Sequence, residues 1–193
     1  GQKILIVNLS KGKIGEINAN LLGMIITGKL MMAALSRIDI LDESVRKDFY
    51  LYMDEFQNFT TDSIATILSE ARKYRLDLVI AHQFIKQLKE EIRNAVFGNV
   101  GSIVAFRIGA EDAEFMKNQF EPVFSPQDLM NVDNFNAHAK LLINNQTVRP
   151  FNIRTIKEKD GSPEMVQALR ETSRLKYGRP REEVEEEIRA GYK

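Results

Sequence analysis

The chain is expected to fold as an α/β domain with a mostly parallel sheet flanked by helices, and three observations predict this. Short apolar runs alternate with longer stretches of helical spacing, which is the pattern of right-handed β-α-β units. Two successive apolar runs, Phe49–Met53 and Leu76–Ala81, end in polar residues, as strands do where an α/β sheet meets its ligand. The composition, 44% apolar and 28% charged over 193 residues, is that of an ordinary one-domain globular protein.

The N-terminal part is expected to form a strand, a turn and a long helix. Lys3–Leu9 is an apolar run that predicts a buried strand, and Ser10–Gly15 has the composition of a turn. Asn18–Arg37 carries apolar residues all round, which predicts a long and largely buried helix. Its most apolar part, Leu21–Leu35, is interrupted by Lys29 and is too short to span a bilayer.

The centre of the chain predicts two strands joined by a helix. The run before Asp54 is short, aromatic and apolar, which favours a strand buried on both faces of a sheet. Thr61-Asp62 can cap a helix over residues 63–74, because apolar residues recur there at helical spacing. Leu76–Ala81 is the next strand, and a helix rich in Lys and Glu follows to about Val96.

The next part predicts a strand, two helices and a hairpin. Ala110–Phe120 is expected to be a helix with acidic residues at its positive end, and Ser125–Asp128 is the capped, proline-led start of a short helix. Two apolar runs flank Asn144–Gln146 and predict a β-hairpin that closes the sheet. The runs expected as strands are Ser102–Ile108, Ala137–Ile143 and Thr147–Ile153.

A change in composition from Ile156 onward divides the chain. Acidic and basic residues dominate there and apolar residues become sparse. We therefore expect a domain over residues 1–156 and a charged helical tail over residues 157–193. Within the tail, Pro163–Tyr177 and Pro180–Ala190 predict two amphipathic helices that pack on the domain or on a neighbour.

Composition and spacing exclude several kinds of site. The chain has 27 basic and 27 acidic residues, and a net charge of zero argues against a free-standing nucleic-acid binder. There are no cysteines, and neither His82 nor His138 has metal-ligand spacing. Gly12-Lys13 lacks the G-x-x-x-x-G-K-[ST] pattern of a phosphate-binding loop. No secretory signal is recognisable.

The candidate chemistry centres on Asp54 and Glu55. An apolar strand that ends in Asp-Glu is the pattern of the second acidic motif (Walker B) of P-loop ATPases. In that motif the Asp helps to hold Mg²⁺, and the Glu orients or deprotonates the attacking water. The alternative is a strand that simply runs out into a solvated loop.

A glutamine and one of three arginines complete the candidate site. Gln83 ends the next strand, so its amide would lie near the two acids if the strands are neighbours, and it could then bond the attacking water or the terminal phosphate; otherwise it merely starts a loop. Arg72 lies at a helix end, where cations offset the negative end of the helix dipole. In the alternative reading it is an arginine finger that reaches a phosphate in the next subunit of a ring, and Arg75 and Arg107 are other candidates for that role.

The segments L-S-E-A-R-K-Y-R-L at residues 68–76 and V-I-A-H-Q at residues 79–83 follow the acidic strand. Together they resemble the TraG/TraD-type coupling proteins of conjugative type IV secretion, and the likeness extends over residues 3–37 and 98–151. This family belongs to the HerA and FtsK branch of RecA-like ring ATPases. The resemblance implies part of a P-loop NTPase domain from a homo-hexameric motor that moves DNA with ATP and Mg²⁺.

By this resemblance, Asp54 is the Mg²⁺-linked acid, Glu55 the catalytic base, Gln83 the phosphate sensor and Arg72 the arginine that acts in trans. The family's phosphate loop lies upstream and is absent here, and the chain begins at Gly1, so we expect a fragment that neither binds ATP tightly nor hydrolyses it alone. The parent would be cytoplasmic, with membrane contact only through segments not present here. Its other partners would be neighbouring subunits and relaxosome or secretion-channel proteins.

Two other functions stay open at the level of sequence. The chain could be a recognition module that binds DNA-processing proteins of the relaxosome without catalysis of its own. It could also be an independent nuclease or metal-dependent hydrolase built on Asp54 and Glu55, although few other acids or histidines lie at the predicted strand ends.

Overall fold

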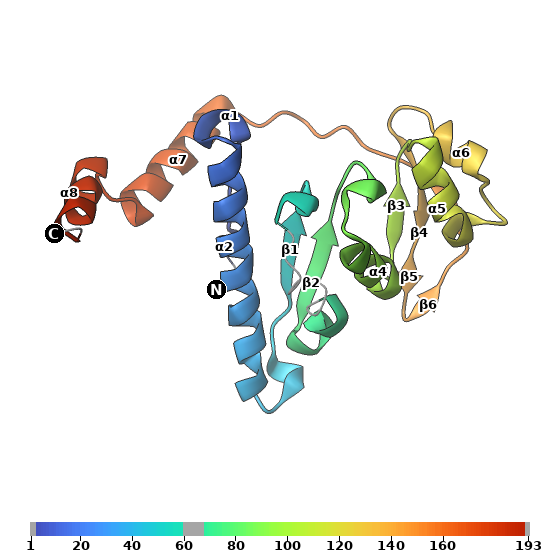
Figure 1. Ribbon diagram of the computed structural model, residues 1–193, viewed down its shortest axis with the longest axis horizontal. Helices are drawn as coiled ribbons and strands as arrows, with labels where there is room; N and C mark the ends of the chain where they lie inside the picture. The colour runs from blue at the N-terminus through green and yellow to red at the C-terminus, as the bar shows by residue number, and fades with distance from the viewer. Residues whose placement is uncertain (1–2, 60–67, 192–193) are drawn as a thin grey trace. The chain divides into compact units, whose positions relative to one another are not determined.

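The computed structural model describes residues 3–59 and 68–191 (Figure 1). The chain divides into two compact units, residues 1–154 and 155–193, which we describe separately. The first unit contains all the strands of the described residues. The second contains the helices α7 (Pro163–Tyr177) and α8 (Arg181–Gly191). These two helices agree with the prediction for the tail.

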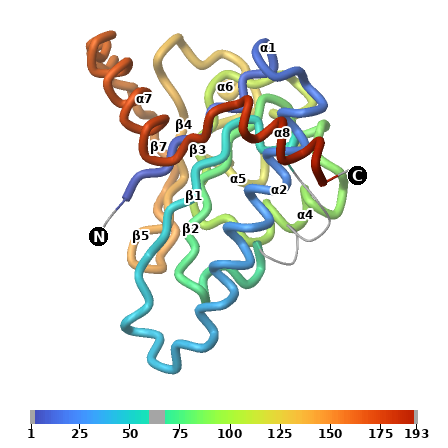
Figure 2. The backbone as a smooth tube through the Cα atoms, turned by 90° about the vertical axis from the view of Figure 1, so that its left-hand side faces the viewer, coloured from blue at the N-terminus to red at the C-terminus, as the bar shows by residue number. Residues whose placement is uncertain are grey.

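The predicted acidic strand and the strand after it are neighbours. Strand β1 (Phe49–Met53) pairs in parallel with β2 (Leu76–Ile80), in a register that sets Met53 opposite Ile80. The inward-facing side chains, such as Leu51 and Leu78, pack into the core. The carboxyl ends of both strands therefore lie at the same edge of the sheet, as Figures 1 and 2 show.

The expectation that β1 is buried on both faces was wrong. Tyr50 and Tyr52 are 59% and 72% exposed, whereas Met53 is buried. Successive side chains of a strand point to opposite faces, and the described elements cover only the face that carries Leu51. One face of β1 is therefore exposed to solvent, and the other packs into the core.

The long helix forms as predicted but is much less buried than expected. Helix α2 (Glu16–Leu35) runs beside β1 and β2 (Figures 1 and 2), and the one-turn helix α1 (Lys11–Ile14) precedes it in place of the predicted turn. The buried side of α2 is a narrow stripe of mostly small residues at helical spacing: Ala19, Gly23, Thr27, Met31 and Ala34. Large apolar residues on the other sides, Leu21 among them, are exposed, because only one face of the helix meets the rest of the domain.

The helical segment that contains α2 is longer than Leu21–Leu35, the part that the sequence analysis judged too short to span a bilayer. The continuous segment Glu16–Asp39, which includes the 3₁₀ helix η1 (Ser36–Asp39), has the length and composition of a membrane-spanning helix. Its buried stripe nevertheless packs against the domain, where Thr27 approaches Met53. The core helix of an α/β domain has the same two properties.

The strand predicted for Lys3–Leu9 is not present. Residues 3–9 have no ladder partner, and Ile4 and Ile6 are 91% and 86% exposed. An apolar run becomes a strand only where a neighbouring strand satisfies its backbone, and among the described residues no strand pairs with this one.

The segments between the strands are short helices. The 3₁₀ helices η2 (Glu43–Val45) and η3 (Phe56–Phe59) flank β1. The helix predicted over residues 63–74, with its cap at Thr61-Asp62, begins among residues 60–67, outside the described residues. Residues 68–70 are helical, and the 3₁₀ helix η4 (Ala71–Tyr74) leads into β2. After β2 come the 3₁₀ helix η5 (Ile85–Gln87) and the helix α4 (Glu90–Asn99).

The rest of the first unit is an antiparallel sheet with two helices. Its strands β3 (Ile103–Ala105), β4 (Asn136–Lys140) and β7 (Phe151–Arg154) lie in that order, and β4 with β7 forms the predicted hairpin. The expectation that this hairpin closes the parallel sheet was wrong, because in the described residues it pairs with β3 in a separate antiparallel sheet. A smaller hairpin, β5 (Leu142–Ile143) and β6 (Gln146–Thr147), turns at two asparagines with positive φ. Helices α5 (Ala110–Phe120) and α6 (Pro126–Met130) form as predicted, and Ser125 and Asp128 make a capping box.

Candidate functional site

Glu55 and Gln83 meet at the carboxyl edge of the parallel strands. The Gln83 amide Nε2 donates to Glu55 Oε1 at 2.6 Å, and the Gln57 amide Nε2 donates to Glu55 Oε2 at 2.5 Å. The carboxylate is half-buried, whereas Gln83 is exposed. Two amides from opposite sides thus hold both oxygens of one carboxylate in a fixed orientation, at the edge where ligands of α/β sheets bind.

The backbone fixes Glu55 in an unusual conformation. Its φ is +49°, in the left-handed region that non-glycine residues rarely occupy, and its N–H donates to Asp54 Oδ1 at 3.0 Å. On either side, the Phe56 N–H donates to the Ala81 carbonyl at 3.1 Å, and the Ala81 N–H donates to the Met53 carbonyl at 2.9 Å. The chain therefore turns sharply at Glu55 while both flanks stay bonded to Ala81, the residue that follows β2. Such strained residues cluster at functional sites.

Asp54 lies beside this cluster with its side chain exposed to solvent. Its recorded hydrogen bond is the local one to the Glu55 N–H, which occupies Oδ1. A carboxylate with free lone pairs at a strand end suits a Mg²⁺ ion that keeps most of its water ligands. Among the described residues, no three acidic or histidine side chains converge into a metal site of their own.

The structure adds two residues that sequence reasoning missed. Gln57 braces Glu55 from the loop side, and only the sharp turn at Glu55 brings it there. His82 packs its ring edge-on against the buried Phe56, with centroids 5.6 Å apart. Burial lowers the pKa of His82 below its usual 6.5, although the carboxylates of Asp112 and Glu55 oppose that shift.

Arg72 lies far from these side chains in its own subunit. It is exposed in η4, which precedes β2, whereas Gln83 follows that strand. Four rises of about 3.3 Å put the first and last residues of β2 roughly 13 Å apart, and Arg72 and Gln83 lie beyond those two ends. Figure 1 shows η4 and η3 at opposite ends of the strand pair. Arg72 and Glu55 are therefore not brought together within one chain.

Two other arginines hold the η4 loop in place. The guanidinium of the buried Arg46 donates to the Lys73 carbonyl at 2.6 Å and to the Ile40 carbonyl at 2.8 Å. Arg37 Nη1 donates to the carbonyls of Tyr74 and Arg75 at 2.6 and 3.0 Å. These bonds satisfy carbonyls at the end of a short helix, which would otherwise lack partners.

The alternative arginines are both engaged locally. Arg75 has a φ of +54° and forms an exposed ion pair with Asp48 at 3.4 Å. Arg107 donates to Asn134 Oδ1 at 3.1 Å, beyond the end of β3. Of the three arginines, Arg72 has no recorded side-chain partner among the described residues.

The sequence comparisons give one match. Residues 48–119 match a protein-family model described as the TraM recognition site of TraD and TraG. That segment holds β1, β2, the Glu55 cluster, η4 and most of α5. Comparison with the curated proteins gives no significant match.

Solved structures of the conjugative coupling protein TrwB are similar over about two thirds of the chain. The unbound form of TrwBΔN70 aligns with a TM-score of 0.54 at 16% identity, covering 67% of this chain and 35% of that one. TrwB with the ATP analogue ADPNP aligns with a TM-score of 0.54 at 17% identity, covering 69% and 37%. TrwB with ADP and Mg²⁺ gives a TM-score of 0.52 at 16% identity, covering 63% and 34%.

These comparisons show the fold and a likeness to one protein family. The α/β fold is similar to that of part of the TrwB chains, which agrees with the α/β fold class that the sequence predicted, and at such low identity the structures show the fold alone. The predicted resemblance to TraG/TraD-type coupling proteins is confirmed by the family match over residues 48–119. The chain spans about a third of the length of the TrwB chains that it matches.

Proposed function

We propose that this chain is the distal part of the nucleotide-hydrolysing domain of a conjugative coupling protein. The observation that carries the proposal is the hydrogen bond between Glu55 and Gln83, which follow adjacent parallel strands. In this role Glu55 accepts the proton of the attacking water, and Gln83 holds the carboxylate until a terminal phosphate competes for its amide.

Two features support Glu55 rather than Asp54 as the base. Its carboxylate is half-buried and held by two amides, whereas that of Asp54 is exposed. Asp54 is better suited to Mg²⁺ held through water, and the ion would supply charge neutralisation at the phosphates. The TrwB structures described with ADPNP and with ADP and Mg²⁺ support the choice of an adenine nucleotide and of that ion.

Arg72 would serve a neighbouring subunit. It points to solvent from a loop that Arg37 and Arg46 hold rigid, at the end of β2 remote from Glu55. At that position the cation lies too far from Glu55 to serve the cluster of its own subunit, which favours a site on another chain. We therefore propose a homo-oligomeric ring, a hexamer by analogy with the family, in which Arg72 acts in trans and the ring moves DNA in the cytoplasm.

Subunit mixing tests the arginine. In the complete gene product that carries these residues, Arg72→Ala and Glu55→Gln are each expected to abolish DNA-stimulated ATP hydrolysis. The two variants are then mixed in one ring. Activity should return wherever an Arg72→Ala subunit, which keeps Glu55, lies next to a Glu55→Gln subunit, which supplies Arg72. Arg107→Ala is the matched control and should keep its activity. Failure of every mixture to recover, with intact assembly, would contradict the assignment in trans.

A second function is favoured by the family match itself. The matched family model is described as a recognition site for a protein, TraM, and it covers the same residues that build the cluster. We therefore propose that residues 48–119 also bind a protein of the relaxosome. A pull-down of relaxosome proteins on the immobilised chain tests this, with the chain after heat denaturation as the control; recovery on the denatured chain alone would contradict it.

A further inference from the structure

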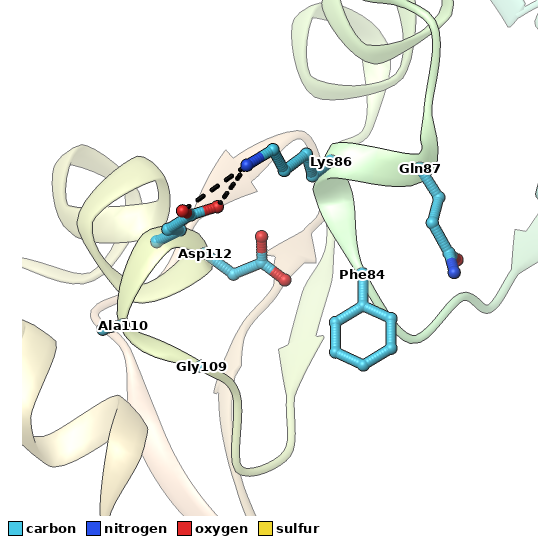
Figure 3. A pocket seen from close by; sticks show the side chains of 7 residues that line it. Phe84, Lys86, Gln87, Gly109, Ala110 and Asp112 are labelled. Carbon is cyan, nitrogen blue, oxygen red and sulfur yellow. Dashed lines mark hydrogen bonds and ion pairs between the residues drawn. The ribbon is translucent and has the colours of Figure 1, made fainter.

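A pocket of about 440 Å³ lies between η5 and the start of α5, next to the site described above (Figure 3). Phe84 and Lys86 line it from one side, and Glu111 and Asp112 line it from the other. In Figure 3 the carboxylate of Asp112 and the ring of Phe84 face the same space, and Lys86 extends across it to α5. Nothing in the proposed hydrolysis uses these residues.

The buried carboxylate of Asp112 lacks a cationic partner. Its side chain belongs to a residue only 7% exposed, and its recorded hydrogen bond is one from the Ile85 N–H to Oδ2 at 3.2 Å. Among the described residues no Lys or Arg nitrogen lies within ion-pair distance of it. Asp112 lies in the first turn of α5, where the positive end of the helix dipole offsets part of its charge. Buried carboxylates usually have a paired cation as well.

The nearest titratable neighbours do not supply that cation. Burial lowers the pKa of His82, so its ring is neutral at neutral pH and adds no positive charge beside Asp112. Lys86 pairs with Glu111 at 3.1 Å, and both side chains are more than three-quarters exposed. The ion pair between them spans the mouth and can open at little cost, since exposed pairs contribute about 0–1 kcal/mol.

The wall opposite the carboxylate is aromatic. Phe84 is 52% exposed although it precedes a buried residue, Ile85, so its ring is available at the surface of the pocket. An aromatic face attracts a cation and also covers the apolar stem behind it. A buried acid and an open ring on two sides of one space favour a long side chain that is apolar along its length and cationic at its end.

We propose that this pocket receives an arginine side chain of a protein partner, with the guanidinium on Asp112 and the stem along Phe84. Two carboxylates against one ammonium make the pocket complementary to a cation. A guanidinium is more weakly hydrated than an ammonium and fits a carboxylate with two parallel bonds. The proposal rests on the recognition function, because residues 84–112 lie within the matched recognition segment; it is independent of nucleotide hydrolysis.

Amide chemical shifts of the ¹⁵N-labelled full chain test the pocket with two probes. N-acetyl-arginine methylamide should shift the amides of residues 84–87 and 109–112 and should saturate. Its citrulline analogue is neutral and nearly isosteric, and it should bind at least about 10-fold more weakly, because a charge-assisted bond is lost. Equal binding of the two probes, or no shift at these amides, would overturn the proposal.

Three variants assign the contact. Asp112→Asn should weaken binding of the arginine probe at least about 10-fold, whereas Glu114→Gln, an exposed acid on the same helix, should leave it unchanged. Phe84→Ala alters an exposed side chain, so it should fold and should also weaken binding, which keeps the test decisive if the buried Asp112→Asn variant does not fold. Binding unchanged in Phe84→Ala, or in a folded Asp112→Asn, would overturn the proposal and leave the hydrolysis proposal standing.

Discussion

Arg46 offers the sharpest test of how the fold holds the Arg72 loop, through the variant Arg46→Met. This change keeps most of the apolar stem and removes the guanidinium, which is bonded to the Lys73 carbonyl at 2.6 Å and to the Ile40 carbonyl at 2.8 Å. A hydrogen bond to a charged group contributes about 1.5–3 kcal/mol, and water can re-solvate part of what is lost. We expect the free energy of unfolding to fall by about 2–4 kcal/mol.

Thermal unfolding followed by circular dichroism measures this loss. For a domain of this size, 1 kcal/mol corresponds to roughly 2–4 °C, so the midpoint should fall by roughly 4–16 °C. Arg75→Met is the matched control, since the Arg75 pair with Asp48 is nearly half exposed on both sides and should contribute at most about 1 kcal/mol. Equal midpoints for the two variants would refute the assignment of the loop to Arg46.

Three further predictions concern stability. Gly23→Ala should destabilise the domain, because the added Cβ would lie 2.2 Å from the Phe59 ring. Gly28→Ala lies in the same helix but meets open space, so it should stabilise the domain by up to about 1 kcal/mol. The midpoints of urea unfolding distinguish the two variants. The pKa of His82 is lower in the folded chain than in the unfolded chain, so the unfolded chain binds the proton first as the pH falls. The free energy of unfolding should therefore decrease below pH 6.5, and the His82→Asn variant, measured over the same pH series, should lack this decrease. Ser125→Ala should cost about 1 kcal/mol by loss of the capping box, and a midpoint equal to wild type would contradict it.

Part of the arrangement around Glu55 could be predicted from the sequence. Alternation of strands and helices predicts parallel strands, and the pairing of β1 with β2, which the sequence left open, brings Glu55 and Gln83 together at one edge. The capping box at Ser125 and the hairpin of β4 and β7 follow from equally local signals. Each of these signals is a short run of residues that can be recognised in the sequence by itself.

Long-range packing decided what sequence could not predict. The apolar composition of residues 3–9 favours a strand, but a strand needs a neighbouring chain that the described residues do not provide. The lack of a covering neighbour among the described residues also explains why Tyr52 of β1 and the outer sides of α2 are exposed to solvent. The bracing of Glu55 by Gln57 depends on a backbone with positive φ, which no local pattern signals at a glutamate.

The most direct test of the central claim is the turnover rate of the complete gene product with Glu55→Gln. If Glu55 is the base, the rate constant of ATP hydrolysis should fall by at least about 100-fold while ATP still binds, since general-base catalysis contributes about 10²–10⁴-fold. Glu90→Gln, an exposed acid at the start of α4, should keep the wild-type rate. An unchanged rate in Glu55→Gln would contradict the account and would leave the cluster as a structural feature of a recognition domain.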